Sequence, residues 1–224
     1  MDKPVETVNI QLYIHEILRF LKHLIIRIPL KTRTFYEKYG SDLQDAGFDA
    51  AFWGFFMLKI ITNYRELDFS LLMGVYAEGN LQKGMERYPD RSEYEQLSYA
   101  EQDHWDYLCE FFHSKDAFLA VWEVQERYTA ALRMEPYRDG FLLTALETAP
   151  QLRGKGYATE LLRKTLAYVT ENSSLPVYSH VKKSNPASLA VHKKCGFQIL
   201  LDHAVYLDGS VFTDSYTLYN KNDT

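Results

Sequence analysis

Cysteine is scarce in this chain, and its scarcity excludes one class of protein. Only 2 cysteines, Cys109 and Cys195, occur in 224 residues, far apart and without metal-ligand spacing. A disulfide-stapled secreted domain needs several cysteines, and a zinc site needs them in close pairs. We therefore predict two free thiols in a cytoplasmic protein and expect no metal.

A surplus of positive charge is also missing. The 25 Lys and Arg residues are outnumbered by 30 Asp and Glu residues, which gives a formal net charge of -5. Such a chain lacks the broad basic field that attracts phosphate backbones. Nucleic acid is therefore not expected as a main partner, although a local basic loop is compatible with this composition.

A long uninterrupted apolar run is missing as well. The segment from Ile14 to Leu30 is rich in Leu and Ile, but four charged residues interrupt it: Glu16, Arg19, Lys22 and Arg27. A transmembrane span or the apolar part of a signal peptide requires a cleaner run. We therefore predict a soluble, unprocessed chain that does not enter a membrane.

Apolar periodicity predicts two helices in the first 66 residues. Apolar side chains recur every three or four residues from Ile10 to Ile28, and the aromatic-rich stretch 46–61 is also expected to be helical. We assign 1–66 to an N-terminal helical extension and 67–224 to the main domain. The extension is expected to pack on that domain or across a homodimer interface, with a membrane-surface or substrate-gating role as the alternative.

The rest of the chain mixes strand and helix patterns. Two hairpins, one of them with an Asp208-Gly209 turn, indicate neighbouring antiparallel strands. Strands are predicted at 69–76, 117–122, 128–134, 141–148, 175–181, 197–206 and 210–219, and helices at 78–88, 101–113, 157–172 and 186–195. The fold class is therefore α/β, in the α+β sense of a mixed sheet with helices.

The loop after strand 141–148 carries the strongest functional signal. It reads Arg153-Gly154-Lys155-Gly156-Tyr157-Ala158 and opens an amphipathic helix. Glycines let a ligand approach the backbone, and N–H groups at a helix start attract phosphate oxygens. A dinucleotide fingerprint would need glycine in place of Thr159, and a P-loop would need Ser or Thr after Lys155. The loop thus predicts a cradle for another phosphate ligand, the alternative being a glycine turn without a ligand.

A second motif lies about thirty residues later. Asn185-Pro186-Ala187-Ser188 begins a helix that ends at Cys195-Gly196-Phe197. With the glycine loop, this motif resembles the GNAT superfamily of acyl-CoA-dependent N-acyltransferases. The family's loop reads Gln/Arg-x-x-Gly-x-Gly/Ala, and its later motif reads Asn-x-x-Ser/Ala-x-x-x-Tyr-x-x-x-Gly-Phe. The resemblance covers residues 68–219, and His192 stands where Tyr is usual.

The resemblance implies both a fold and a cofactor site. The fold would be a mostly antiparallel central sheet flanked by helices. Acetyl-CoA would bind the loop formed by Arg153, Gly154, Lys155, Gly156, Tyr157 and Ala158, and its pantetheine arm would bind backbone groups of Leu146 and Thr148 where two strands splay apart. Asn185 and Ser188 would contact the same cofactor, although helix capping alone also explains both residues.

Two side chains are candidates for proton transfer. Glu147 is next to the pantetheine end of its strand and could bind or deprotonate the amine; the alternative is a solvated or salt-bridged glutamate. His192, in the position of the family's tyrosine, could protonate the leaving thiolate, bond to the cofactor, or merely pack beside it.

The predicted activity is acetyl transfer from acetyl-CoA to an amine by direct attack. The alternatives are a non-catalytic acyl-CoA-binding or sensing protein and an interaction module built by the N-terminal helices. The acceptor stays open among small amines, antibiotics, peptide N-termini and lysines, because residues 69–113 would shape its site. The acidic and histidine side chains of that region are expected to form a solvated helix face: Glu101, Asp103, His104 and His113.

Overall fold

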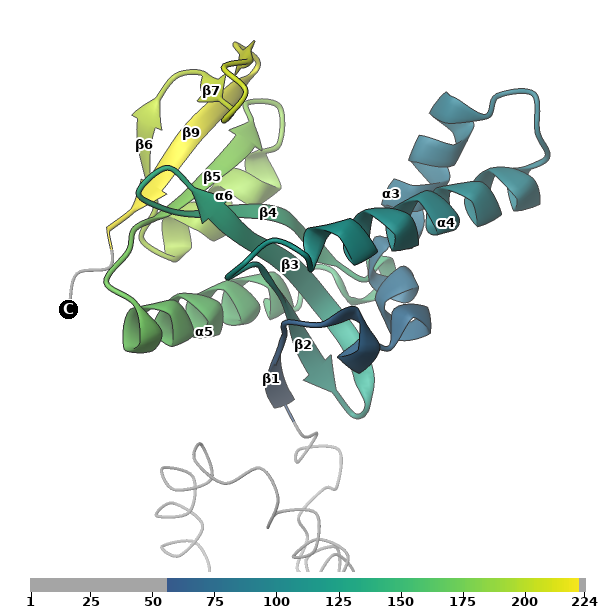
Figure 1. The fold of residues 1–224 in the computed structure, drawn as a ribbon, viewed down its shortest axis with the longest axis horizontal. Helices are drawn as coiled ribbons and strands as arrows, with labels where there is room; N and C mark the ends of the chain where they lie inside the picture. The colour runs from purple at the N-terminus through teal and green to yellow at the C-terminus, as the bar shows by residue number, and fades with distance from the viewer. Residues whose placement is uncertain (1–55, 222–224) are drawn as a thin grey trace, which may run out of the picture. The chain divides into compact units, whose positions relative to one another are not determined.

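The computed structural model describes residues 56–221 (Figure 1). The predicted helix over 10–28 lies outside these residues. Four α-helices are described: α3 (Phe69–Arg87), α4 (Glu93–Phe111), α5 (Tyr157–Asn172) and α6 (Pro186–Lys194). The strands are β1 (Phe56–Ile61), β2 (Phe118–Val124), β3 (Arg127–Tyr137), β4 (Gly140–Thr148), β5 (Val177–Lys182), β6 (Gln198–Leu201), β7 (Ala204–Val205), β8 (Val211–Phe212) and β9 (Ser215–Asn220).

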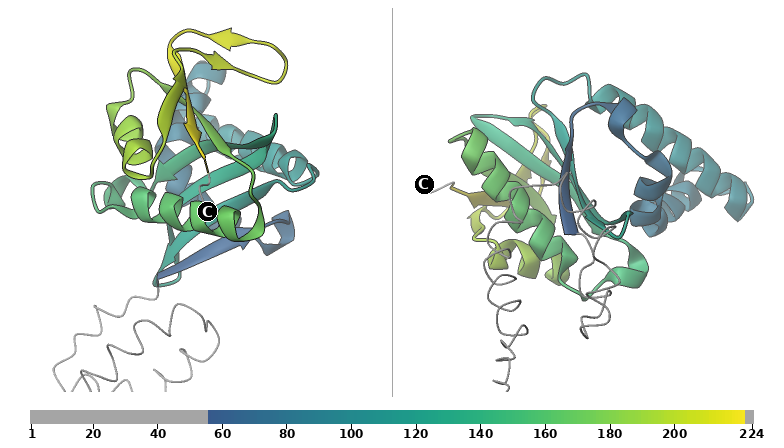
Figure 2. Two further views of the ribbon diagram at one scale, coloured as in Figure 1. Left: turned by 90° about the vertical axis from the view of Figure 1, so that its left-hand side faces the viewer. Right: turned by 90° about the horizontal axis from the view of Figure 1, so that it is seen from below.

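Seven of these strands form one sheet in the order β1-β2-β3-β4-β5-β9-β6. Every neighbouring pair is antiparallel except β4 and β5. Helix α5 packs on one face through Leu161 and Leu162, while α3 and α4 pack on the other through Leu72 and Leu108 (Figure 2). This arrangement confirms the predicted mostly antiparallel sheet flanked by helices.

The prediction of a helix over 46–61 is wrong for its last six residues. Phe56–Ile61 is strand β1, which pairs with β2 from Phe56 opposite Val124 to Ile61 opposite Leu119. An apolar run fits a buried strand or a helix equally well, and here the partner strand decides. Within the described residues the sheet thus begins at residue 56, and residues 1–55 of the predicted extension lie outside them.

The predicted strand at 69–76 is also wrong. These residues form the first half of α3, which the predicted helix 78–88 continues. The Asp68 side chain caps the helix by accepting a 3.0 Å hydrogen bond from the Leu71 N–H. Helix α4 begins earlier than predicted, at Glu93, because Ser92 and Glu95 form a capping box. The two helices approach closely, since a Cβ on Gly84 would lie 2.3 Å from the Gln96 carbonyl oxygen.

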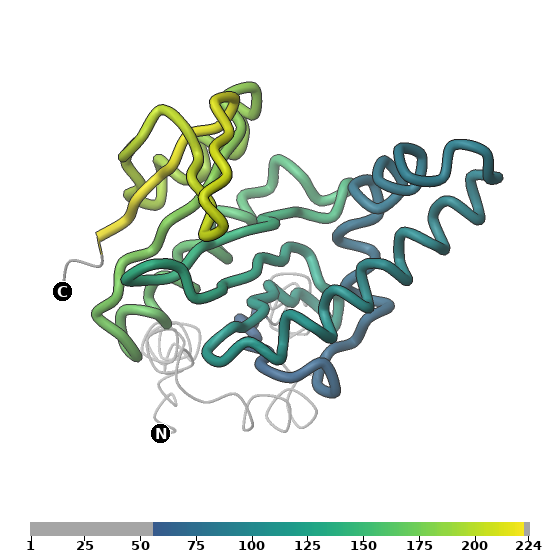
Figure 3. The backbone as a smooth tube through the Cα atoms, turned by 45° about the horizontal axis from the view of Figure 1, so that its top comes forward, coloured from purple at the N-terminus to yellow at the C-terminus, as the bar shows by residue number. Residues whose placement is uncertain are grey.

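The C-terminal strands form a divided hairpin. Strand β6 pairs with β9 in the main sheet, while β7 and β8 form a separate two-stranded ribbon around the predicted Asp208-Gly209 turn. Figure 3 shows the α3–α4 hairpin extending from one side of the central strands and this C-terminal segment on the other. Between residues 56 and 221, no helix combines the length and apolarity needed to cross a bilayer.

Candidate active site

Strands β4 and β5 separate halfway along their length. They pair only from Phe141 opposite Val177 to Leu143 opposite Ser179, so the rest of β4 has no partner in β5. A bulge lies in that free part, where Ala145 and Leu146 together oppose one residue of β3. Ala145 has a φ of 50°, in the left-handed region. The predicted splay is therefore present, and it opens one edge of β4.

The open edge presents backbone groups of Thr148. The Ala149 N–H donates a 2.9 Å hydrogen bond to the Thr129 carbonyl in β3. Successive residues of a strand turn their backbone groups to opposite sides. The N–H and carbonyl of Thr148 therefore point away from β3, into the gap beside β5. An extended ligand could bind there as an added strand.

The glycine loop leads directly from β4 to α5. Gly154 and Gly156 have φ angles of 77° and 85°, and α5 starts at Tyr157 without a side-chain cap on its first N–H groups. A Cβ built on either glycine would meet nothing within 4 Å, so space is open in front of this backbone. Lys155 is exposed beside it, and Ala158 belongs to the first turn of α5. Free N–H groups, open space and a cation together suit a phosphate.

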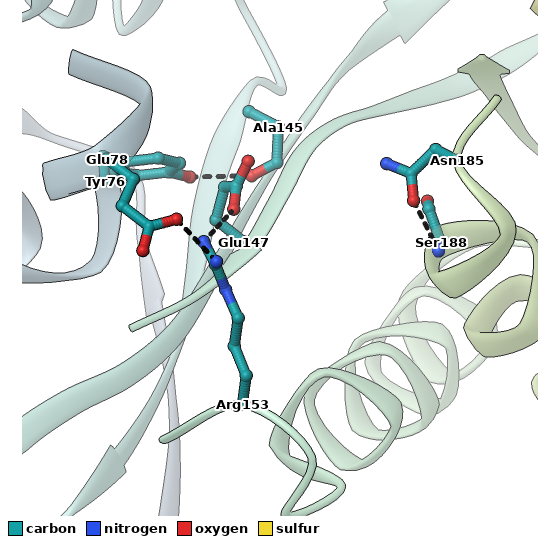
Figure 4. Close-up of polar contacts among 7 residues, drawn as sticks. All are labelled: Tyr76, Glu78, Ala145, Glu147, Arg153, Asn185 and Ser188. Atoms are coloured by element: carbon teal, nitrogen blue, oxygen red, sulfur yellow. Dashed lines mark hydrogen bonds and ion pairs between the residues drawn. The ribbon is translucent and has the colours of Figure 1, made fainter. Parts of the chain in front are cut away.

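Arg153 turns its side chain toward carboxylates on the α3 side of the sheet. Its Nη1 lies 2.6 Å from Glu78 Oε2, and its Nη2 lies 3.8 Å from Glu147 Oε2 (Figure 4). Burial raises the pKa of Glu147, and the Arg153 charge opposes this rise. The Arg153 side chain thus connects the glycine loop to a pair of carboxylates.

Helix α6 holds the second motif. Asn185 caps it, since the Asn185 Oδ1 accepts a 3.0 Å hydrogen bond from the Ser188 N–H (Figure 4). His192 is fully buried, with Nδ1 2.8 Å from the Ser188 carbonyl oxygen, so Nδ1 carries the proton. Its Nε2 is buried without a partner among the described residues, and burial lowers the pKa of His192. The imidazole is therefore neutral at pH 7, with a free lone pair on Nε2.

The sequence reasoning missed several polar residues on the α3–α4 side of the sheet. Tyr76 donates a 2.9 Å hydrogen bond to the Ala145 carbonyl, and the His104 ring meets the Tyr76 ring edge-on at 4.9 Å. His104 Nδ1 lies 3.0 Å from Asn80 Oδ1, and burial, with the nearby Arg133 charge, lowers the pKa of His104 to about 4. The expectation that His104 belongs to a solvated face is therefore wrong. Helical spacing would have shown Tyr76 and Asn80 on one face, had 69–76 been interpreted as helix.

The other residues of the predicted solvated face have ordinary surface roles. Asp103 accepts hydrogen bonds from Arg87 at 2.6 Å and from Tyr88 at 3.1 Å, and His113 is exposed. Within the described part of the chain, no three His, Cys, Asp or Glu side chains are grouped as metal ligands would be. Cys109 and Cys195 are both free thiols.

Comparisons with known proteins agree with this geometry. The family model described as acetyltransferase (GNAT) family matches residues 83–197, just over half of the chain. The PaiA N-acetyltransferase from Thermoplasma acidophilum, solved with coenzyme A, superposes with a TM-score of 0.53 at 15% identity, covering 74% of this chain and 99% of that one. The spermidine N-acetyltransferase from Vibrio cholerae, solved with CoA and spermine, gives 0.50 at 20% identity, covering 75% and 97%. No curated protein sequence matches the chain.

Proposed function

Because the chain belongs to the acetyltransferase (GNAT) family, we propose that it transfers an acetyl group from acetyl-CoA to an amine by direct attack. The observation that carries the proposal is the position of the uncapped start of α5 at the end of β4, next to the gap between β4 and β5. A phosphate site and an open strand edge thereby adjoin each other. Coenzyme A combines phosphates with an extended arm that has amide groups, so it fits both.

The proposed cofactor contacts follow the chain from β4 into α5. Backbone groups of Leu146 and Thr148 would bind the pantetheine arm, and N–H groups from Gly154 to Ala158 would hold the pyrophosphate. The open space before both glycines supports this assignment, because a Cβ there would occupy the place of the phosphate. Lys155 would add a mobile positive charge, and Asn185 and Ser188 would lie along the cofactor. Bound acetyl-CoA supplies the activated thioester.

The proton transfers are assigned to Glu147 and His192. Glu147 would take a proton from the incoming ammonium, directly or through water, and its raised pKa brings it closer to the range of an effective general base. A backbone N–H at the bulge would stabilise the developing oxyanion. His192 Nε2, whose lone pair is free, would accept the second proton, which the attacking nitrogen loses once the N–C bond has formed, and pass it to the departing sulfur. The N–C bond forms and the C–S bond breaks without an enzyme-bound acyl group, so Cys195 has no nucleophilic role.

One observation favours the alternative of a non-catalytic acyl-CoA-binding or sensing protein. The family commonly has a tyrosine hydroxyl at the position of His192, and here the buried imidazole carries its proton on Nδ1, bonded to the Ser188 carbonyl. A neutral imidazole in this tautomer has no Nε2 proton to give. Both functions therefore predict binding of the cofactor, and only the enzymatic one predicts turnover.

The test combines binding with turnover. Calorimetry with coenzyme A should show a single site, and incubation with acetyl-CoA and a panel of amines should release free thiol together with an acetylated amine identified by mass. Cofactor binding without acetylation of any amine would favour the sensing function. Absence of binding would overturn both. Deletion of residues 1–55 should leave binding intact, because the proposed cofactor residues all lie after residue 145; its loss would favour the role of the N-terminal helices as the main functional module.

A further inference from the structure

Three neighbouring side chains on the α3–α4 face of the sheet have buried polar atoms without a partner. They are the Nε of Arg133, the Oγ1 of Thr144 and both ring nitrogens of His180, none of which is hydrogen-bonded to a described residue. Buried polar groups are paired in most proteins, because leaving one unpaired costs about 1–3 kcal/mol. Three such residues in one place indicate that a polar ligand completes their bonds.

These residues form a row across three strands. Arg133 in β3 lies directly opposite Thr144 in β4. Thr144 follows the last residue of β4 that pairs with β5, and His180 occupies the corresponding next position of β5. The row therefore crosses the sheet where β4 and β5 separate, at the entrance to the proposed cofactor gap.

All three side chains lie on the same face. The Arg133 guanidinium is 4.3 Å from the centre of the Tyr107 ring of α4, so this side chain lies on the face of the sheet that α4 covers. Tyr137, four residues further along β3, is on the same face and meets the His180 ring edge-on at 5.6 Å. Thr144 shares the face of its cross-strand partner Arg133. We name these three residues the Arg133 row.

The Arg133 row carries the fixed positive charge of one guanidinium. Arg133 has donors only, and it forms no ion pair with any carboxylate in the described chain. Glu135 lies two residues along the same strand; burial raises the pKa of its carboxyl group, and the Arg133 charge opposes this rise. Lys83 adds a further positive charge nearby, since it and Arg133 both lower the pKa of His104. An anion from outside would satisfy these groups.

Two hollows lie beside the end of β3 that follows Arg133. A hollow of about 420 Å³ is lined by Tyr107 and Glu135, and a second of about 260 Å³ by Tyr137 and Tyr206. The two rings of the second hollow both contact His180, with Tyr206 at 4.6 Å. Both hollows share Glu135, two residues along β3 from Arg133, and none of the three row residues lines either hollow.

The carboxylates lie at the other end of the same face. Glu147 and Glu78 both contact the guanidinium of Arg153, and the Lys83 charge also acts on Glu147. The charges of Glu147 and Arg133 both act on Tyr76 and on Lys83, so the two side chains belong to one electrostatic environment. A polyamine such as the spermine in the Vibrio cholerae structure would bring a second cation toward Arg133.

We infer that the acceptor amine carries an oxyanion, either a carboxylate or a phosphate, and that Arg133, Thr144 and His180 hold this group while Glu147 receives the amine. The inference rests on the proposed acetyl transfer and specifies its substrate class. Amines without an acidic group would leave the Arg133 row unpaired and are expected to be poor acceptors.

Matched acceptor pairs test the inference. Amino acids would be compared with their carboxamides, 2-aminoethyl phosphate with ethanolamine, and all of them with spermidine. The acid-bearing members should show at least about tenfold higher kcat/KM. The first pair tests for a carboxylate and the second for a phosphate. Higher kcat/KM for spermidine or for the neutral members would overturn the inference and leave acetyl transfer intact, whereas failure of coenzyme A binding would overturn the proposed function instead.

Variants locate the acid-binding groups. Arg133→Met keeps an unbranched stem for contact with Tyr107, and it should raise KM for acid-bearing acceptors at least about tenfold with no change for their neutral partners. Thr144→Val should act in the same direction. Arg91→Met is the matched control, since Arg91 is exposed in the connection between α3 and α4 and its charge acts on Glu95; it should change neither KM.

A second readout does not depend on turnover. With coenzyme A present, the acid-bearing compounds should raise the unfolding temperature of the wild type and of Arg91→Met, and should not raise that of Arg133→Met. The unfolding temperature without acceptor verifies that each variant is folded. Equal effects of an acid and its amide on the wild type would overturn the inference.

Discussion

The hydroxyl group of Tyr76 in α3 donates a 2.9 Å hydrogen bond to the backbone carbonyl of Ala145 at the bulge of β4. Ala145 adopts a φ of 50°, which is unfavourable for a residue with a Cβ. The bulge lies where the thioester is proposed to bind. This bond therefore links the helix on the acceptor side to the backbone on the cofactor side.

Tyr76→Phe tests whether this hydrogen bond stabilises the fold and positions the bulge. The variant keeps the ring contact with His104 but leaves the Ala145 carbonyl without its partner, so the free energy of unfolding should fall by about 1–2 kcal/mol. Turnover should fall about tenfold as the bulge loses its fixed position. Urea unfolding and steady-state kinetics measure both quantities. Tyr94→Phe, at a side chain that is 82% exposed, is the control and should have no effect; wild-type values for both variants would show that the bond does not position the bulge.

Gly156→Val tests the phosphate cradle. A valine at this φ of 85° is strained, and its side chain would fill the open space before the first N–H groups of α5. Affinity for coenzyme A, measured by calorimetry, should fall at least about tenfold. Gly209→Val is a matched control, because Gly209 has a φ of 84° and equally open surroundings in the β7–β8 turn. Backbone strain alone would lower the stability of both variants equally and would not single out the affinity of Gly156→Val. Unchanged affinity for coenzyme A in Gly156→Val would exclude the cradle.

His192→Gln tests the proton relay. Glutamine keeps an N–H donor for the Ser188 carbonyl but cannot relay a proton at neutral pH. If the imidazole passes a proton to the leaving sulfur, kcat should fall about 10²-fold while the affinity for coenzyme A changes little. Rapid kinetics and calorimetry give the two values. Equal losses in kcat and affinity would instead identify His192 as a cofactor contact.

Local sequence signals predicted the cofactor half of the fold well. The glycine loop, the helix over 157–172 and the Asn185 cap depend on residues close together in the chain, and each is found at its predicted place. The acceptor half was predicted poorly. The run from Phe69 to Tyr76 looks like a strand by composition, and only its cap at Asp68 and its packing against α4 make it a helix.

The candidate site shows the same division. Glu147 was identified because it lies next to a motif, whereas Arg133, Thr144 and His180 become neighbours only through the pairing of three strands. Nothing in the sequence connects residues 133 and 180. Pairing register and unsatisfied buried atoms are properties of the folded chain, so the Arg133 row could not be predicted from spacing.

His104 predicts a dependence of stability on pH. Its pKa is about 4 in the folded protein and near 6.5 when unfolded, so the unfolded chain binds more protons between these values. Stability should therefore fall as the pH falls from 6.5 towards 4, with His104 contributing a loss of about 2 kcal/mol between pH 7 and pH 5. His104→Gln keeps a donor to Asn80 and should remove this part of the loss. Urea unfolding of both proteins at the two pH values measures it, and an identical loss in the variant would exclude His104 as its source.

Glu147→Gln tests the general base. Glutamine keeps the size of the side chain but removes the charge that attracts and deprotonates the ammonium. The pKa of Glu147 is raised by burial, so the wild-type rate should climb with pH through a value above the ordinary 4.5. The variant should lose this limb of the profile, and its maximal rate should fall about 10²-fold. Affinity for acetyl-CoA should barely change.

Glu78→Gln is the matched control for Glu147→Gln. Glu78 also contacts Arg153, at 2.6 Å, but it comes from α3 and does not belong to the strand that is proposed to bind the thioester. It should therefore keep the pH limb and lose less than about tenfold in rate, because it only helps to position Arg153. If the rise of the rate with pH were lost in Glu78→Gln and kept in Glu147→Gln, Glu78 would be the general base.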